Sequence, residues 1–187
     1  MNTTKSRLRD MVKRSFEFYP REILDSWSEI IQDVILETIR PYKTIMSYVS
    51  TPREVSTFKI LKEVLKDGKI LVVPKVVCNS IVPVRIKSLE ELSIGAFKVL
   101  EPEDSSFFDI SMLEVIIVPG IAFNTNLHRI GHGGGHFDKF LKSLPPYVLK
   151  IGLAYDFQVV EEEFEDHWDE KVDIVITEKR RIECTLL

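Results

Sequence analysis

The chain has 187 residues, of which 44% are hydrophobic and 29% charged, and its net charge is −4. This is the composition of an ordinary globular protein long enough to bury a core, so we expect a single domain over residues 1–187. The sequence has no dense basic stripe, no run of about 18 apolar residues and no apolar leader, which predicts a cytoplasmic protein whose partners are neither nucleic acid nor a membrane.

The first forty residues favour helix. In residues 21–39, apolar side chains recur at spacings of three and four, which predicts an amphipathic helix that Pro41 ends. The expected apolar stripe consists of Ile23, Trp27, Ile30 and Val34, with Leu24, Ile31 and Ile35 beside it.

A second helix is predicted over residues 51–68. Thr51 stands at the N-cap, Pro52 at the first helical position and Glu54 three residues after the cap, which is the pattern of a capping box. Gly68 is expected to end the helix. The expected inner face consists of Val55, Phe58, Leu61 and Leu65.

Short apolar runs alternate with the helical patterns. They predict buried strands at residues 44–49, 69–74, 114–120, 148–155 and 172–177, with a further strand at 81–86. This last strand is expected at a sheet edge, because Pro83 lacks a backbone donor. Apolar strands separated by helices imply an α/β three-layer sandwich, with a mainly parallel central sheet and helices on both faces. Ligands of such sheets bind beyond the carboxyl ends of the strands.

Residues 128–140, HRIGHGGGHFDKF, hold three of the four histidines and four of the eight glycines. They follow the strand at 114–120 and lead into a predicted helix with Phe137, Phe140, Leu141 and Leu144 as its apolar positions. The glycines permit positive φ and close approach of a ligand to backbone amides. Together with the helix N-terminus and Arg129, they suit a phosphate. A turn without ligand remains an open alternative, because the loop is neither a Walker A loop nor GxGxxG.

His128, His132 and His136 also raise the possibility of a metal site, because they fall at i, i+4 and i+8. That spacing shares one face only on a helix, which consecutive glycines disfavour, and no nearby cysteine completes a zinc set. We therefore favour polar or phosphate-contacting roles for these histidines. Cys78 and Cys184 are expected to be buried apolar side chains rather than a disulfide or a zinc clip.

Residues 119–141, PGIAFNTNLHRIGHGGGHFDKFL, resemble a motif of the 5-formyltetrahydrofolate cyclo-ligases, PGxAFDxxGxRLGRGGGYYDxFL. Four other segments match in order: KSRLR near the start, YVSTPREVST, VVPKV at 72–76, and GLAYDFQ followed by HWDEKVDIVITE. Because the matches cover nearly the whole chain in order, the sequence is identified as similar to this family. The resemblance implies a fold of the NagB/RpiA/CoA-transferase type and a monomer.

The resemblance also implies an enzyme that uses ATP and Mg²⁺ to close a ring. ATP would phosphorylate the formyl oxygen of 5-formyltetrahydrofolate to an iminium phosphate. Nitrogen 10 would then attack, releasing phosphate and giving 5,10-methenyltetrahydrofolate and ADP. Phosphorylation turns a poor leaving group into a good one, so catalysis would consist mostly of positioning and charge stabilisation.

Carried over by position, the resemblance implies ligand contacts from several parts of the chain. ATP would contact Lys5, Ser6, Arg7, Leu8, Arg9, Arg129, Ile130, Gly131, His132, Gly133, Gly134, Gly135, His136 and Phe137. The folate would contact Val49, Glu54, His132, Gly133, Gly134, Gly135 and His136. Arg129 and His132 would position phosphates, and Asp138 and Asp169 would bind Mg²⁺, which prefers oxygen ligands.

Each of these residues also has a plainer interpretation. Residues 5–9 are compatible with a solvated basic helix face, Glu54 with the capping box, Asp138 with a carboxylate of the first helical turn, and Asp169 with a wet acidic surface. Only their joint register with the family favours the ligand-binding roles.

The chain departs from the family pattern within these segments. The family's GRGGG arginine is His132, its tyrosine pair is His136–Phe137, its AFD ends in Asn124, its EVDT has Ser56, and its HD is Trp168–Asp169. Histidine is shorter than arginine and titrates near 6.5, which predicts weaker turnover or a preference for lower pH. The alternative is a non-catalytic or retuned relative that binds nucleotide or folate. A third possibility is an enzyme like sugar-phosphate isomerases or CoA transferases, which would need no ATP.

Overall fold

The computed structural model describes residues 3–95, 99–103, 106–164, 166 and 169–184. Its helices are α1 (Thr3–Ser15), α2 (Arg21–Thr38), α3 (Phe58–Lys66) and α4 (His136–Ser143), with single-turn helices at Phe16–Phe18, Leu89–Glu91, Ile110–Met112 and Asp156–Gln158. Its strands are β1 (Thr44–Ser47), β2 (Ile70–Val77), β3 (Ser80–Ile86), β4 (Leu92–Ile94), β5 (Leu100–Pro102), β6 (Val115–Val118), β7 (Ala122–Asn124), β8 (Arg129–Ile130), β9 (Leu149–Leu153), β10 (Val159–Val160), β11 (Ile174–Ile176) and β12 (Arg181–Glu183).

The main sheet of the described residues has seven strands in the order β12-β11-β9-β6-β1-β2-β3. The strands from β11 to β2 run parallel, and the two edge strands, β3 and β12, are antiparallel to their neighbours. The predicted mainly parallel sheet is therefore confirmed, and Pro83 lies on an edge strand as expected. The finer likeness to sugar-phosphate isomerases and CoA transferases stays a prediction.

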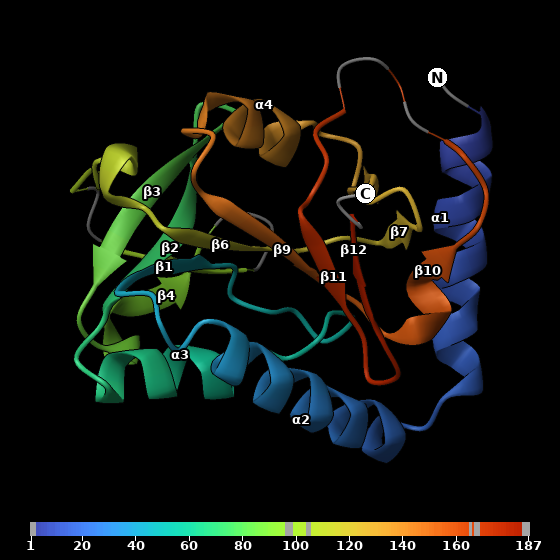
Figure 1. Ribbon diagram of the computed structural model, residues 1–187, viewed down its shortest axis with the longest axis horizontal. Coiled ribbons are helices and arrows are strands. Elements are labelled where there is room, and N and C mark those ends of the chain that lie inside the picture. Colours follow the sequence, from blue (N-terminus) through green and yellow to red (C-terminus); the bar gives the residue numbers. More distant parts are fainter. Residues whose placement is uncertain (1–2, 96–98, 104–105, 165, 167–168, 185–187) are drawn as a thin grey trace.

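Helices cover both faces of this sheet (Figure 1). On one face, α2 and α3 pack against side chains of the strands. Ile117 of β6, for example, lies in the same hydrophobic cluster as Ile31 of α2. On the other face, α4 contributes Phe140 to a cluster that contains Ile116. Neighbouring strand residues point to opposite sides, so both faces have to be apolar, which explains the continuous apolar runs in the sequence.

Helix α2 forms where predicted, and the predicted stripe was right in part. The buried positions are Leu24, Ser28, Ile31, Gln32 and Ile35, of which Leu24, Ile31 and Ile35 were expected, whereas Ile23, Ile30 and Val34 are 40–45% exposed. The buried row was hard to recognise in the sequence because two of its residues, Ser28 and Gln32, are polar. The Ser28 hydroxyl shares a hydrogen bond of 2.8 Å with the Tyr155 hydroxyl. The side-chain oxygen of Gln32 accepts a hydrogen bond from the backbone of Lys59, at the start of α3.

Helix α3 is shorter than predicted and begins at Phe58 instead of near Thr51. Residues 51–54 form a turn, in which the Glu54 amide donates to the Thr51 carbonyl at 3.1 Å. The Glu54 carboxylate accepts hydrogen bonds from the Thr51 amide and hydroxyl at 2.7 and 2.8 Å. The backbone bond expected of a capping box therefore forms, but no helix follows it directly.

The inner face of α3 matches the expected one in part. Leu61 in the helix and Val55 just before it are buried as expected, whereas Phe58 and Leu65 are only partly buried. Ile60 and Val64 complete the buried face. Gly68 follows the helix with φ +70, which is the left-handed conformation expected of a terminating glycine.

A small sheet, β10-β7-β8, was not predicted. Strands β7 and β8 form a hairpin after β6, and β8 belongs to residues 128–140, so the histidine- and glycine-rich segment begins as a strand and becomes a loop only from residue 131. Helix α1 packs on this sheet, where its Leu8 and Val12 join a cluster with Ile130 (Figure 1). This docking brings the start of the chain beside residues that precede α4.

Two smaller expectations have different outcomes. Both cysteines are free, as expected, but both are exposed, so the predicted burial was wrong. Cys78 stands with φ +46 in the turn between β2 and β3, where the backbone conformation and not the core sets its position. Within the described residues, no helix is both long and apolar enough to cross a lipid bilayer.

The contact between Gly152 of β9 and Phe123 of β7 joins the two sheets. A Cβ built on Gly152 would lie 2.4 Å from the fully buried Phe123 ring. We expect Gly152→Ala to lower the free energy of unfolding by about 1–3 kcal/mol, because a packed core accommodates an added methyl group only with strain. Urea unfolding measures this loss. In a Phe123→Leu background the same substitution should cost less, and an equal cost in both backgrounds would contradict the contact.

Candidate active site

Two cavities meet at residues 131–135, which we call the glycine loop. The basic cavity, of about 490 Å³, is lined by Lys5, Arg9, Arg129, Lys139 and Lys142 together with Asp138, Asp166 and Asp169. The apolar cavity, of about 520 Å³, is lined by Tyr48, Val49, Glu54, Val76, Ile81 and Phe137, among others. Arg129, Gly131, Gly135 and Asp138 line both, so the glycine loop and its flanks form the wall between the cavities.

The apolar cavity lies beyond the carboxyl ends of β1, β2 and β6. Its lining includes Tyr48 and Val49 just after β1, Pro119 and Gly120 just after β6, and Val76 near the end of β2. This is the edge at which parallel sheets bind their ligands, as the sequence predicted.

The glycine loop has a backbone that other residues adopt only with strain. Gly133 has φ +105 and Gly135 has φ +65, and the Gly135 carbonyl accepts the first helical hydrogen bond of α4 from Lys139 at 3.1 Å. The Gly131 carbonyl accepts a hydrogen bond of 2.8 Å from Nε of Arg9 in α1. The loop is thus tied to helices on both sides while its glycines leave the backbone accessible.

Arg129 is buried in the wall between the cavities. Its Nη2 donates to Asp138 Oδ1 at 2.7 Å, its Nη1 donates to the Pro119 carbonyl at 3.4 Å, and its guanidinium carbon lies 5.6 Å from the centre of the Phe137 ring. Burial lowers the pKa of Arg129, and the charge and hydrogen bond of Asp138 oppose that shift. A guanidinium stays charged in proteins, so this wall carries a fixed positive charge.

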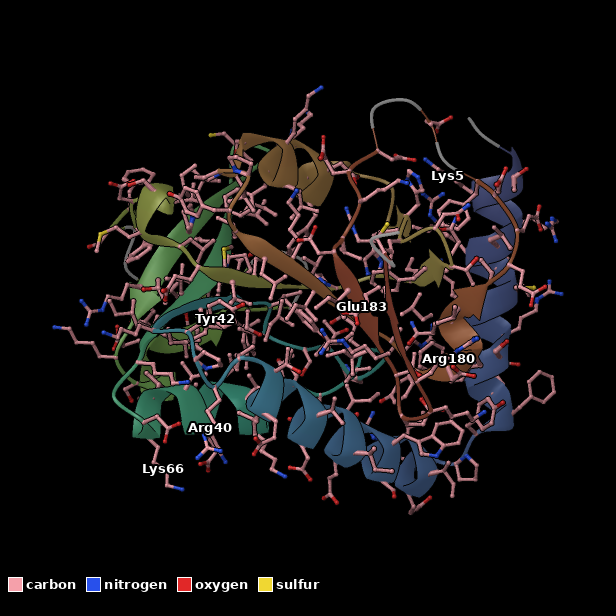
Figure 2. All side chains as sticks on the ribbon, viewed as in Figure 1. Lys5, Arg40, Tyr42, Lys66, Arg180 and Glu183 are labelled. Atoms are coloured by element: carbon pink, nitrogen blue, oxygen red, sulfur yellow. The ribbon has the colours of Figure 1, made fainter. Side chains whose placement is uncertain are left out.

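Lys5 is the second buried cation. Its ammonium donates to Asp166 Oδ2 at 2.8 Å and also to Asp169 Oδ2, which in turn accepts a hydrogen bond from the Asp166 amide at 2.8 Å. Figure 2 shows Lys5 on the side of α1 that faces the body of the protein. Burial acts to lower the pKa of Lys5, but the hydrogen bonds and charges of both aspartates outweigh it and raise the pKa. Lys5 therefore remains an ammonium group.

The other residues of KSRLR have different surroundings. Arg9 lines the basic cavity with Lys5, one helical turn away. Leu8 is buried in the cluster between α1 and the small sheet, whereas Ser6 is exposed. Arg7 is exposed and pairs with Glu162, whose hydrogen bond and charge raise the Arg7 pKa. Only the first and last of the five residues face the basic cavity, and Leu8 anchors the helix.

The residues predicted for the folate line the apolar cavity, except Gly133, which lines the basic cavity. Val49 is buried in its lining. Glu54 uses Oε2 for Thr51, and its Oε1 lies 3.9 Å from Nε2 of the exposed His132. The hydrogen bond from the Thr51 amide and a place in the cavity lining are therefore compatible, and contact of Glu54 with the folate stays a prediction.

His136 connects the glycine loop to the tip of the β2–β3 hairpin. Its Nδ1 donates to the carbonyl oxygen of Asn79 at 2.8 Å, and Asn79 has φ +62. Because β2 and β3 contribute Val76 and Ile81 to the apolar cavity, this hydrogen bond helps to set the distance between two of its walls.

The three histidines of residues 128–140 have separate surroundings. His128 is buried in the β7–β8 hairpin, His132 is exposed, and His136 contacts Asn79. Among the described residues, no three side chains of His, Cys, Asp or Glu are grouped as metal ligands would be. The polar or phosphate-contacting roles that the sequence favoured for these histidines stay predictions.

The structure adds residues to the site that the sequence did not indicate. Asp166 shares Lys5 with Asp169, Lys139 and Lys142 line the basic cavity from α4, and Tyr48 lines the apolar one. The signals were weak, since Asp166 lies in an acidic run and Tyr48 in an apolar one. Trp168, a position where the chain departs from the family pattern, lies outside the described residues.

Comparison with known proteins places this site in a family. The sequence profile of the 5-formyltetrahydrofolate cyclo-ligase family matches residues 2–178. The chain belongs to the 5-formyltetrahydrofolate cyclo-ligase family. The profile spans α1, the glycine loop and the segment of Asp166 and Asp169, and thus the three parts of the chain that form the basic cavity.

Individual relatives agree with this membership in the cyclo-ligase family. A Schizosaccharomyces pombe protein named "Probable 5-formyltetrahydrofolate cyclo-ligase" is 28% identical over 97% of this chain and 98% of its own length. The solved structure of a 5,10-methenyltetrahydrofolate synthetase from Aquifex aeolicus is 34% identical, with a TM-score of 0.85 over 96% of this chain and 92% of that one. A synthetase from Mycoplasma pneumoniae, 23% identical with a TM-score of 0.77 over 93% and 98%, shares the fold.

In this cyclo-ligase family member, the pairing of Arg129 with Asp138 makes a stability prediction. We expect Asp138→Asn to lower the free energy of unfolding by about 2–3 kcal/mol, at or below the lower end for a broken buried pair because Asp138 is partly exposed. Arg129→Met should cost less, because it removes the buried charge and keeps an apolar stem beside Phe137. Urea unfolding of both variants measures the asymmetry, and an equal or larger loss for Arg129→Met would show that the buried charge is not what costs stability.

Proposed function

We propose that this protein converts 5-formyltetrahydrofolate to 5,10-methenyltetrahydrofolate at the expense of ATP, with ADP and phosphate as the other products. The observation that carries the proposal is the pair of cavities that share one wall of glycine backbone and buried guanidinium. A polyphosphate suits the basic cavity, and a flat ring system suits the apolar one. Reacting groups bound on either side of that wall would meet beside Arg129.

The basic cavity supports the nucleotide part of the proposal. Arg9, Lys139 and Lys142 contribute positive charge from two helices, and the glycine loop leads into the N-terminus of α4. Helix N-termini and accessible loop amides favour phosphate oxygens. Arg129 would stay in place during the reaction, because burial and Asp138 fix its guanidinium, and such preorganised charge stabilises a transferring phosphoryl group.

Asp138 and Asp169 are the residues that we propose for Mg²⁺. Both line the basic cavity with carboxylate oxygens, which are the ligands that a hard cation accepts, and each contacts its basic partner through one oxygen only. A bound Mg²⁺ would neutralise charge on the phosphates. By holding the cation, the two carboxylates would place its positive charge beside the wall shared with the apolar cavity.

The apolar cavity supports the folate part. Burial of Tyr48, and then the charge of Glu54, raise the pKa of its phenol well above the ordinary value, so Tyr48 stays neutral. Its hydroxyl donates to the Val55 carbonyl at 2.9 Å, which fixes the ring in the cavity lining. Glu54 is the carboxylate that we propose for a polar contact with the pterin, with Val49 packing beside it.

An absorbance assay tests the proposed reaction. We expect purified protein with 5-formyltetrahydrofolate, ATP and Mg²⁺ to accumulate 5,10-methenyltetrahydrofolate, detected by its absorbance, and we expect no accumulation without ATP. Binding of both ligands without a gain in absorbance would instead support the non-catalytic alternative, which His132 in place of the family arginine motivates. ATP-independent turnover of a sugar phosphate or a CoA ester would support the isomerase or transferase alternative.

His132 makes a second test specific to this chain. Its side chain is 76% exposed in the lining of the apolar cavity. We expect His132→Arg to raise kcat/KM by about three- to tenfold, because a guanidinium carries a fixed charge and can contact phosphate oxygens through two donors. An equal or lower kcat/KM for His132→Arg would contradict the expectation that the substitution of the family arginine weakens turnover.

The remaining expectations from the sequence stay predictions. They are a single domain over residues 1–187, a monomer, a cytoplasmic location, and no nucleic-acid or membrane partner. The assays above do not depend on them.

A further inference from the structure

Both carboxylates proposed for Mg²⁺ are already neutralised by basic side chains. Asp138 pairs with Arg129, and Asp169 pairs with Lys5, which also holds Asp166. A divalent cation entering this cavity would have to compete with these internal cations for the carboxylate oxygens. The two basic partners differ in how readily they can move away.

Arg129 is the partner that stays. It contacts Asp138, Pro119 and the Phe137 ring together, and its side chain is only 3% exposed. Moving its planar guanidinium would break all of these contacts in the wall between the cavities.

Lys5 is the partner that can exchange. Its charge is a compact ammonium group at the end of a flexible four-carbon stem, which accepts a new partner by rotation of the stem. Among the described residues, the carboxylates that line the basic cavity are Asp138, Asp166 and Asp169, and each already has a basic partner. An incoming polyphosphate would therefore supply the new acceptor for Lys5.

We propose that Lys5 keeps free divalent cations away from Asp166 and Asp169 and releases these carboxylates only when a polyphosphate occupies the basic cavity. Mg²⁺ sheds its water reluctantly, so it gains little by displacing an ammonium group that is already bound. With phosphates present, Lys5 moves to the phosphate oxygens, and the carboxylates become available to a cation that the same phosphates also bind. Nucleotide and metal binding are then mutually strengthening, as linkage requires. The inference rests on the proposed function in naming ATP as the polyphosphate and Asp169 as a ligand of Mg²⁺.

Metal binding without nucleotide tests this exclusion directly. Mn²⁺ serves as the probe, and its free concentration is followed by electron paramagnetic resonance during titration of the full chain. We expect Lys5→Met to bind Mn²⁺ at least about tenfold more tightly than the wild type, because two carboxylates lose their internal cation. The matched control, Lys142→Met, removes the same charge from the exposed rim of the same cavity and should change the affinity by less than about threefold.

The wild type gives a second measurement that needs no variant. An ATP analogue with a non-hydrolysable bridge between the β and γ phosphates should raise its Mn²⁺ affinity more than it raises that of Lys5→Met or Lys5→Gln. Equal Mn²⁺ affinity of the wild type with and without the analogue would overturn the proposal. So would a folded Lys5 variant, checked by circular dichroism, whose nucleotide-free affinity matches that of the wild type. That outcome would mean that Lys5 only holds α1 against Asp166 and Asp169.

Failure of this inference and failure of the proposed reaction give different results. The Mn²⁺ titration contains no folate and does not depend on turnover. Tighter Mn²⁺ binding by Lys5→Met together with no gain of absorbance in the folate assay would uphold the exclusion and reject the reaction. The reverse pair of results would reject the exclusion alone.

Discussion

The site depends on the need to neutralise a guanidinium that is buried between two cavities. Arg129 comes from β8 and Asp138 from the first turn of α4, and the glycine loop is the chain that joins them. Because a buried charge without a partner is strongly unfavourable, the ion pair fixes both ends of the loop. Glycines between the two residues let the backbone pass through positive φ, so the loop closes over a short distance and leaves room on either side.

The central layer of the fold could be predicted from the sequence because it rests on local patterns. Strands buried on both faces are mostly apolar, and the positions of the parallel strands followed from that property. The edge strand β12, with exposed Arg181 and Glu183, was not predicted. The choice of helix face was not local. In α2 two apolar rows compete, and the buried one contains Ser28 and Gln32, whose partners Tyr155 and Lys59 lie in other parts of the chain. The start of α3 was predicted wrongly for a related reason. The hydrogen bonds between Glu54 and Thr51 form equally well in a turn that no helix follows.

The candidate site also has a part that the local sequence could predict and a part that it could not. The glycine loop, its arginine and the helix after it are contiguous, so their association could be predicted from residues 128–140. The separation of the space into two cavities by the glycine loop could not be predicted, because the facing walls come from β1, β2 and α1. The pairing of Lys5 with Asp166 and Asp169 was also inaccessible, since those residues lie in an acidic run typical of solvated surface. Family resemblance indicated Asp169 as a site residue, but only the fold shows that its partner is the ammonium group of Lys5.

The same pairing sets a limit on when the molecule can acquire its ligand site during synthesis. Lys5 and Asp169 are separated by 164 positions, so α1 is made long before the segment that supplies acceptors for its ammonium group. Until then the amphipathic face of α1, with Leu8 and Val12, has no complete surface to cover, because β10 is also late. Nascent chains on the ribosome therefore lack both this site and the strands β11 and β12 of the central sheet until the residues beyond position 169 have been made, and nucleotide cannot assist the earlier stages of folding.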